Sequence, residues 1–422
     1  MKNKIFNKSR ILYFLKKSYI KNGIWMYLLQ FFNAIVPLLT LPYITRVLGA
    51  SQYGLYALAI NFVGYLQVLV EYGFGMSATR EIALSSEDDR KTNQIFSEVL
   101  FSRVILYFIA LAITLVYIIL FNSNKILINC ILALFLCLTG NVIQQNWLFQ
   151  GLQDMKYISI VNIVGRMISV AMIFILIKEA NDIVLYCILY AVSPFISGLI
   201  GLIVAKRKYN IQIIKITLSQ ILEALKKGWF VFTTSLSSKV FGAIGITFLG
   251  LFSENAIVGT FSAIQKIPNM VMLAWVPIGQ IIYPISSQHM NESFQNGIIF
   301  IKQTRRKILP LFVFASGLII IFSKKIVLIA FGEDYAKNYY WLIPLIIWLL
   351  LGINNNFLGI QTLLASGHDK EYSKCFQISV VFTVVINLVF IYFGKGMGAS
   401  LAPAISELFL GILLRHEVYK LG

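Results

Sequence analysis

The feature that most constrains the fold is a succession of long apolar runs separated by short polar stretches. A helix needs roughly 20 mostly apolar residues to cross about 30 Å of bilayer hydrocarbon. In lipid the backbone must satisfy its own polar groups, which favours helices. We therefore predict an all-α polytopic membrane protein. About twelve transmembrane helices are expected, near residues 24–48, 55–79, 100–121, 126–149, 159–177, 183–205, 229–252, 256–285, 308–322, 339–364, 374–393 and 397–414.

Composition supports a membrane location and gives no sign of catalysis. Of the 422 residues, 58% are hydrophobic and 13% are charged, whereas soluble domains have about 45–50% and about 25%. The four Cys lie in or beside apolar runs without a CxxC pair, and the three His are far apart. We therefore expect neither a disulfide framework nor a metal site, no cofactor, and no enzymatic activity.

The net charge of +18 is explained by topology. With the N-terminus in the cytoplasm, 27 of the 36 Lys and Arg fall on the inner side and seven on the outer side. Cytoplasmic loops carry such an excess in membrane proteins. We predict that both termini are cytoplasmic and that nucleic acid is not a partner. Residues 1–22, where basic and apolar residues alternate, predict a basic amphipathic segment on the membrane surface.

An internal repeat indicates two halves. The polar stretch 206–228, expected to be a cytoplasmic basic linker, separates residues 23–205 from residues 229–422, with six expected spans in each part. The segments LFQGLQDMKY (148–157) and LLASGHDKEY (363–372) follow corresponding spans. Parallel repeats of this kind occur in transporters with a substrate route between the halves. This favours two six-helix bundles around a central cavity, although chance similarity between apolar sequences remains an alternative.

Residues 41–83 read LPYITRVLGASQYGLYALAINFVGYLQVLVEYGFGMSATREIA. This segment resembles the polysaccharide repeat-unit (O-antigen or capsule) flippases of the multidrug/oligosaccharidyl-lipid/polysaccharide exporter superfamily. The resemblance also covers the length, span count and two-fold plan of the chain. It implies a bacterial plasma-membrane carrier that moves undecaprenyl-diphosphate-linked oligosaccharide from the cytoplasmic to the outer face. It further implies a cationic lumen and a pathway shared with polymerase and chain-length proteins.

Charged residues within spans are rare and are functional candidates. A diphosphate-sugar headgroup is anionic, so its carrier needs cationic partners. The candidates are Lys266, Lys239, Arg46 and Arg80. Lys266 is the strongest, because its depth hinders snorkelling and because lipid II flippases also place a cation before a proline in this helix. Snorkelling to the membrane interface is the alternative for Arg80 and Arg46.

For the other polar residues within the expected spans, the sequence allows two possible roles each. Glu71 could pair with a cation or carry a coupling proton, and Glu407 is a weaker candidate of the same kind. Amides suit hydroxyl-rich sugars, but most intramembrane amides bond between helices. Coupling to a proton or sodium gradient remains open. The sugar-contact candidates are Asn33, Asn61, Gln67 and Gln265.

Prolines within the first and eighth spans are candidates for hinges. Proline interrupts the helical hydrogen-bond ladder, so it produces either a static kink or a moving joint. The residues concerned are Pro37, Pro42, Pro268 and Pro277.

Two other functions compete with a flippase. A drug or cation antiporter of the same superfamily would be expected to use an acidic lumen, whereas Lys and Arg predominate within these spans. A membrane polysaccharide polymerase or ligase typically needs a substantial outer loop. The longest outer loop expected here, 323–338, has about 16 residues, and the chain has no recognisable catalytic motif.

Overall fold

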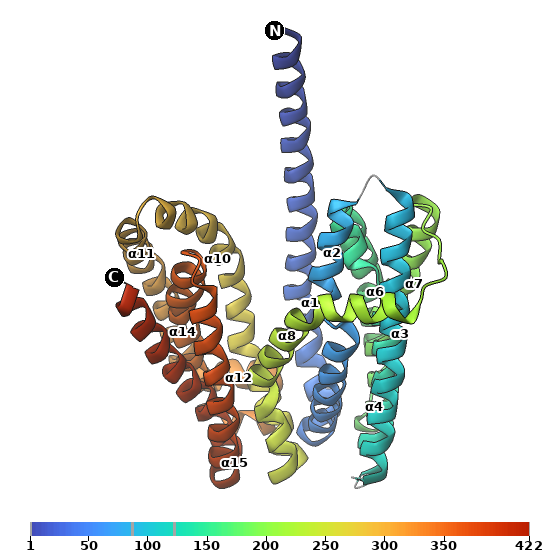
Figure 1. The fold of residues 1–422 in the computed structure, drawn as a ribbon. Helices are drawn as coiled ribbons and strands as arrows, with labels where there is room; N and C mark the ends of the chain where they lie inside the picture. The colour runs from blue at the N-terminus through green and yellow to red at the C-terminus, as the bar shows by residue number, and fades with distance from the viewer. Residues whose placement is uncertain (1, 86–87, 121–123, 422) are drawn as a thin grey trace. The chain divides into compact units, whose positions relative to one another are not determined.

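A computed structural model describes residues 2–85, 88–120 and 124–421, with side chains from residue 21 onward in these ranges. Within them every regular element is a helix (Figure 1). Nine stretches are long and apolar enough to cross a membrane, and a bent helix pair makes a tenth. Two of these stretches, Lys21–Leu84 and Asp369–Leu421, are each divided by a non-helical residue, Gly49 and Lys395. The described chain thus has room for twelve spans, and the all-α polytopic prediction is confirmed.

The first helices run from the N-terminus to the middle of the chain. They are α1 (Lys2–Glu71), α2 (Phe74–Leu84), α3 (Asp89–Leu120), α4 (Lys125–Ile143), α5 (Asn146–Gly151), α6 (Met155–Leu176), η1 (Ala180–Asp182), α7 (Ile183–Lys208) and α8 (Leu218–Phe252).

The remaining helices complete the chain. They are α9 (Asn255–Ile264), α10 (Lys266–Glu292), α11 (Phe294–Ile321), α12 (Ser323–Phe331), α13 (Glu333–Ala336), η2 (Tyr339–Trp341), α14 (Leu342–Leu358), the π-helix η3 (Gly359–Leu364) and α15 (Asp369–Leu421).

The chain forms two compact units whose borders fall inside helices. The first comprises Met1–Thr40 and Phe62–Leu236, and the second comprises Leu41–Asn61 and Ser237–Gly422. Of the expected linker, only residues 209–217 lie outside a helix, because α8 already begins at Leu218. The predicted division of the chain at 206–228 remains a prediction. So does the amphipathic character of residues 1–22, since side chains 1–20 lie outside the described residues.

Glycines explain why Leu41–Asn61 belongs to the second unit. Gly49 has a φ of 69°, which ends the first span and turns the chain. Beyond the turn, α1 crosses α9 so closely that a Cβ at Gly259 would lie 2.0 Å from the carbonyl oxygen of Ala50. Small residues allow such backbone contact between membrane helices. Within the segment that carries the family resemblance, Gly49 thus forms a turn, and Ala50 beyond it lies at a helix crossing with Gly259 of α9.

The second expected span is broken near the end that is expected to face the cytoplasm. Tyr72 and Gly73 have φ values of 45° and 79°, so α1 stops at Glu71 and α2 starts at Phe74. The Tyr72 ring stacks on Phe232 of α8, with centroids 4.5 Å apart and an interplanar angle of 9°. The break is therefore held against α8, within the first unit.

The two segments that indicated a repeat form the same kind of turn. Gln153 and Gly367 have φ values of 58° and 81°, and the next residue, Asp154 or His368, donates its backbone N–H to a carbonyl five residues back. This is the hydrogen-bonding pattern of a Schellman helix end. The structural correspondence is shifted by one residue from the alignment of the letters.

The expected outer loop 323–338 is largely helical. It contains α12 and α13, and α12 is bent by 73° from α11. The helix that contains the ninth expected span is also longer than the apolar run 308–322, because residues 294–307, a mixture of polar and apolar residues, form the first part of α11. Apolar periodicity marks only the lipid-facing part of a helix, so it missed these extensions.

Candidate functional site

Lys266 lies at a break inside the eighth span. The span is divided into α9, which ends at Ile264, and α10, which starts at Lys266, with Gln265 between them. Proline has no N–H to donate to the carbonyl four residues back, and its ring crowds that carbonyl. Pro268 stands four residues after Ile264, so it accounts for the position of the break. Gln265 itself keeps helical dihedrals (φ −61°, ψ −21°), and Asn255–Glu292 still forms one stretch long enough to cross a membrane, as expected for the span over 256–285, with a local irregularity beside the candidate residue.

The Lys266 side chain is exposed and unengaged. Among the described residues it forms no hydrogen bond or ion pair. It lies eleven residues beyond the start of α9, which is roughly 16 Å along a helix. That is about half the thickness of the hydrocarbon layer. A lone ammonium at such a depth needs water or an anion beside it.

Lys239 lies in the same unit as Lys266. It is half-buried in α8, and its charge and that of Lys266 lie within range of one another. Two ammonium groups near each other favour a bound anion, because each raises the free energy of the other when nothing lies between them. The structure therefore brings together two of the four predicted cations.

Arg46 has a partner within the protein. Its Nη2 atom donates to the carbonyl of Ile329, near the C-terminal end of α12. A cation is favourable there because helix C-termini carry partial negative charge. The neighbouring Tyr335 hydroxyl donates to the carbonyl of Thr45 at 3.3 Å. Arg46 thus helps to fix α12 to α1, a role that sequence reasoning missed.

Arginines in the first unit are also engaged with helix backbone or amides. Buried Arg103 donates through Nη1 to the carbonyls of Asn141 at 3.1 Å and Gln144 at 2.9 Å, where α4 ends. The Arg166 Nη1 atom donates to Asn33 Oδ1 at 2.6 Å. Asn33, a predicted sugar contact, therefore bonds between helices. Nothing in the local sequence marks Arg103 as a helix cap, because its partners are 38 and 41 residues away.

Arg80 is exposed on α2 and, like Lys266, has no hydrogen bond or ion pair to a described residue. Its place in the span differs, because it lies four residues before the C-terminal end of α2 at Leu84. The exposure of Arg80 is equally consistent with snorkelling to the membrane interface and with substrate binding.

Most of the remaining polar candidates bond to protein groups. Asn61 donates to Thr247 Oγ1 at 2.9 Å, joining α1 to α8. Gln67 donates to Glu71 Oε1 at 2.8 Å, and the Glu71 charge acts on Arg103. Whether Glu71 pairs with a cation or carries a coupling proton stays a prediction. Gln265 stands at the α9–α10 break without a side-chain bond to any described residue.

The proline candidates differ in their local structure. Helix α1 continues through Pro37 and Pro42, and α10 continues through Pro277. Only Pro268 lies beside an interrupted helix. Motion at any of these positions remains a prediction.

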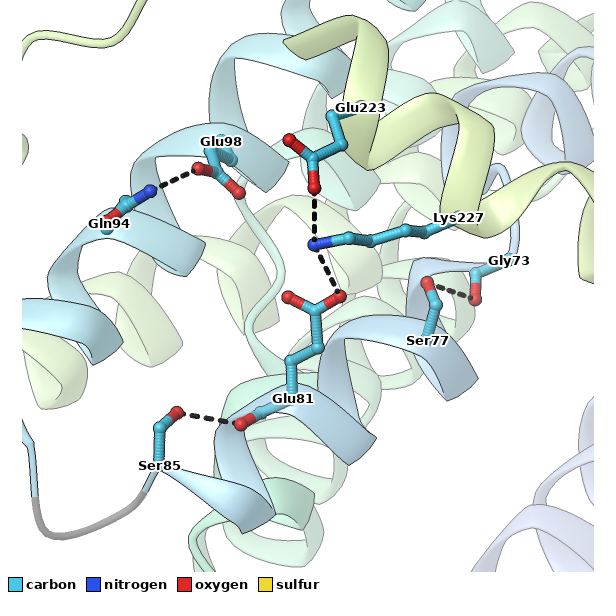
Figure 2. Close-up of polar contacts among 8 residues, drawn as sticks. All are labelled: Gly73, Ser77, Glu81, Ser85, Gln94, Glu98, Glu223 and Lys227. Carbon is cyan, nitrogen blue, oxygen red and sulfur yellow. Dashed lines mark hydrogen bonds and ion pairs between the residues drawn. The ribbon is translucent and has the colours of Figure 1, made fainter. Parts of the chain in front are cut away.

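The first unit contains a cluster of charged and polar side chains that the sequence did not predict (Figure 2). Lys227 of α8 lies 3.2 Å from Glu81 of α2 and 3.4 Å from Glu223, measured between Nζ and carboxylate oxygens. Glu98 of α3 accepts a hydrogen bond of 2.8 Å from Gln94. The residues come from three helices, which is why their proximity could not be read along the chain. The Lys227 ammonium is neutralised here and ties the start of α8 to α2.

Comparison with models of known protein families shows to which family the chain belongs. A family model described as "Polysaccharide biosynthesis protein" matches residues 19–290. The chain belongs to this family. The match includes residues 41–83 and Lys266, so the resemblance to polysaccharide flippases predicted from the sequence is confirmed.

Relatives in this family match along most of the chain. A protein of Escherichia coli (strain K12) named "Putative O-antigen transporter" is 27% identical over 396 residues, covering 93% of this chain and 94% of its own length. A protein of Haloferax volcanii named "Probable low-salt glycan biosynthesis flippase Agl15" is 23% identical, covering 94% and 82%. These names denote carriers, in agreement with the expectation that the chain is not an enzyme.

Solved structures share the fold. The lipid II flippase MurJ in an inward closed conformation matches with a TM-score of 0.76 and 13% identity, covering 95% of this chain and 87% of the other. A multidrug transporter of the MATE family in an inward-facing conformation has a TM-score of 0.69 and 15% identity, covering 92% and 98%. At such identities the likeness concerns the fold alone.

Proposed function

We propose that the protein flips undecaprenyl-diphosphate-linked oligosaccharide repeat units from the cytoplasmic to the outer face of the bacterial plasma membrane. The headgroup crosses by alternating access while the lipid tail stays in the bilayer, and the repeat units are used for surface polysaccharide. The relatives named as a transporter and a flippase along nearly the whole chain support this proposal. Polymerase and chain-length proteins are the expected partners downstream.

The observation that carries the proposal is the unengaged ammonium of Lys266 at the α9–α10 break. A diphosphate crossing bare hydrocarbon would lose its hydration at a cost of many kcal/mol. A cation held within the span offsets part of that cost. Arg46, Arg103 and Arg166 are engaged with protein groups, so Lys266 is the deepest cation left to meet an anionic headgroup, with Lys239 near it.

The membrane potential favours export of an anion. With the cell interior negative, moving two negative charges outward is downhill by roughly 4–5 kcal/mol per 100 mV if they cross the full field. The carrier then needs to lower the barrier rather than supply the driving force. Lys266 would do so by stabilising the headgroup at mid-membrane.

The test uses cells that lack their own flippase and have a matched polysaccharide pathway. Surface polymer is measured for wild type, Lys266→Ala, Lys266→Arg and the control Lys307→Ala, an exposed lysine on α11. Membrane levels of all four proteins are matched. We expect wild type and the control to restore polymer, Lys266→Ala to lose at least tenfold, and Lys266→Arg to retain part of the activity.

Other outcomes would reject the proposal or its site. Failure of wild type to restore polymer, together with resistance to cationic drugs, would identify an antiporter instead. Equal polymer with wild type and Lys266→Ala would leave the function standing but remove Lys266 from the substrate path.

A further inference from the structure

The second unit contains a cavity that the flippase proposal does not use. It has a volume of about 590 Å³ and lies between α14 and α15. Glu407 and Asn355 line one part of it, and Arg415 and His416, near the end of α15, line another. By the charge distribution of the sequence, we expect the end of α15 to be cytoplasmic. The cavity lining thus extends along α15 from Glu407, within the expected last span, to His416, toward the expected cytoplasmic side.

Asn355 holds the Glu407 carboxyl group in a fixed orientation. The Asn355 Nδ2 atom donates to Glu407 Oε2 at 2.7 Å and to the Glu407 backbone carbonyl at 2.6 Å. Both residues are buried, with exposed fractions of 8% for Glu407 and 5% for Asn355. The two bonds join α14 to α15 at one point and leave Oε1 without a bond to any described residue.

The neighbouring backbone leaves room for this pair. A Cβ atom at Gly411 would lie 2.6 Å from Asn355 Oδ1, and one at Gly352 would lie 3.5 Å from Glu407 Oε1. A larger residue at Gly411 would push the amide away from the carboxyl group. The packing of α14 and α15 thus accommodates a carboxyl–amide pair within a membrane span.

No cation neutralises this carboxyl group. Among the described residues Glu407 forms no ion pair. The titratable group in electrostatic range is the Tyr372 hydroxyl, from the first part of α15. Arg415 lies eight residues further along the helix, or about 12 Å. A largely buried carboxylate with an amide donor but no cation beside it is costly to ionise, whereas the neutral acid is tolerated.

We propose that Glu407, oriented by Asn355, is a proton-binding site that exchanges protons with the cytoplasm through the α14–α15 cavity during the transport cycle. The carboxylate takes up one proton on Oε1 and later releases it, and Asn355 holds Oε2 in both states. Arg415 and His416 line the route between the carboxyl group and the expected cytoplasmic side. The link to transport rests on the proposed function, whereas proton binding itself does not.

Proton binding is tested on the purified full-length protein by infrared spectroscopy during a pH titration. Wild type, Glu407→Gln, Asn355→Leu and the control Glu254→Gln, an exposed carboxyl near the start of α9, are compared. We expect a protonated-carboxyl band at neutral pH in wild type and in the control. The band should be absent in Glu407→Gln and shifted in Asn355→Leu, where the donor to Oε2 is lost.

Coupling to transport is tested in the flippase-deficient cells at several external pH values. We expect Glu407→Gln to reduce surface polymer at least tenfold at equal membrane level, and Glu254→Gln to match wild type. Glutamine keeps the size of glutamate and its capacity to bond to Asn355. A loss in Glu407→Gln would therefore come from the missing proton exchange rather than from misfolding.

Three results would overturn the inference. The first is the same infrared band in Glu407→Gln as in wild type. The second is no band in wild type together with stabilisation by sodium chloride, but not choline chloride, that depends on Glu407. The third is full, pH-independent activity of Glu407→Gln. If wild type restores no polymer at all, the flippase proposal fails, and the infrared titration still decides whether Glu407 binds a proton.

Discussion

A Cβ atom at Gly54 would lie 1.9 Å from the carbonyl oxygen of Asn255, so the backbones of α1 and α9 are in direct contact at this crossing. The contact, with the hydrogen bond from Asn61 to Thr247, explains why the residues that follow the Gly49 turn belong to the second unit. A glycine is therefore required at position 54, because any side chain there would prevent the close approach of α1 and α9.

Substitution of Gly54 by alanine is expected to destabilise the protein. The new methyl group must push α1 away from α9, and such overpacking costs about 1–3 kcal/mol. Gly242→Ala in α8 is the matched control, because no atom lies within 4 Å of its added Cβ. The thermal unfolding temperature in detergent should fall for Gly54→Ala only. Equal unfolding temperatures for the two variants would show that the backbones of α1 and α9 are not in close contact at Gly54.

Arg103→Leu is expected to weaken the first unit. The buried guanidinium bonds to the carbonyls of Asn141 and Gln144. Hydrogen bonds to charged groups contribute roughly 1.5–3 kcal/mol. The free energy of unfolding should decrease by about that amount, with a smaller loss for Arg103→Lys. Arg90→Leu, at an exposed position of the same helix, serves as control. If Arg90→Leu lowers the free energy of unfolding as much as Arg103→Leu does, the effect comes from removing a positive charge from α3 and not from the hydrogen bonds to the end of α4.

Arg46→Ala separates a structural role from substrate binding. Because Arg46 donates to the Ile329 carbonyl, its loss should reduce stability by about 0.3–1 kcal/mol, as for other cations at helix C-termini. The measurement is the unfolding temperature of the purified variant beside its surface polymer in cells. If Arg46→Ala unfolds at the same temperature as wild type but no longer restores surface polymer, Arg46 acts in substrate transport rather than in stabilising the contact between α1 and α12.

The contact between Asp154 and Tyr209 predicts a pH dependence. The Tyr209 hydroxyl donates to Asp154 Oδ2 at 2.7 Å, and Lys208 bonds to the same oxygen. Burial would raise the pKa of Asp154, but the hydrogen bonds from Lys208 and Tyr209 outweigh it, so its pKa lies below the ordinary value. Burial and the bond to Asp154 raise the pKa of Tyr209 to about 12, so Tyr209 stays a donor at neutral pH.

Because the pKa of Asp154 is lower in the folded than in the unfolded protein, its contribution to stability is present above the unfolded value of about 3.9 and is lost below it. The difference in unfolding temperature between wild type and Asp154→Asn should be largest at neutral pH. It should vanish as the pH falls through the folded-state pKa. A difference that is constant with pH would show that the carboxylate charge does not contribute.

The sequence by itself determined the number and the helical nature of the spans, and it indicated Lys266. The reason is that membrane insertion depends on residues adjacent in the chain: apolar runs of sufficient length mark spans, and lysine and arginine counts indicate orientation. The proline at 268 and the cation at 266 are also neighbours in sequence. The same local information set span ends too early where polar residues continue a helix, as in α11.

Only the tertiary structure decided which intramembrane polar groups are engaged. Arg46 and Ile329 are 283 residues apart, and Arg166 and Asn33 are 133 apart. Asn355 and Glu407 meet because α14 and α15 pack together, with Gly411 leaving space for the amide. Hydropathy scores each residue alone, whereas a hydrogen bond needs two groups at a set distance and angle. The distinction between an engaged Arg46 and an unengaged Lys266 therefore lies in the fold.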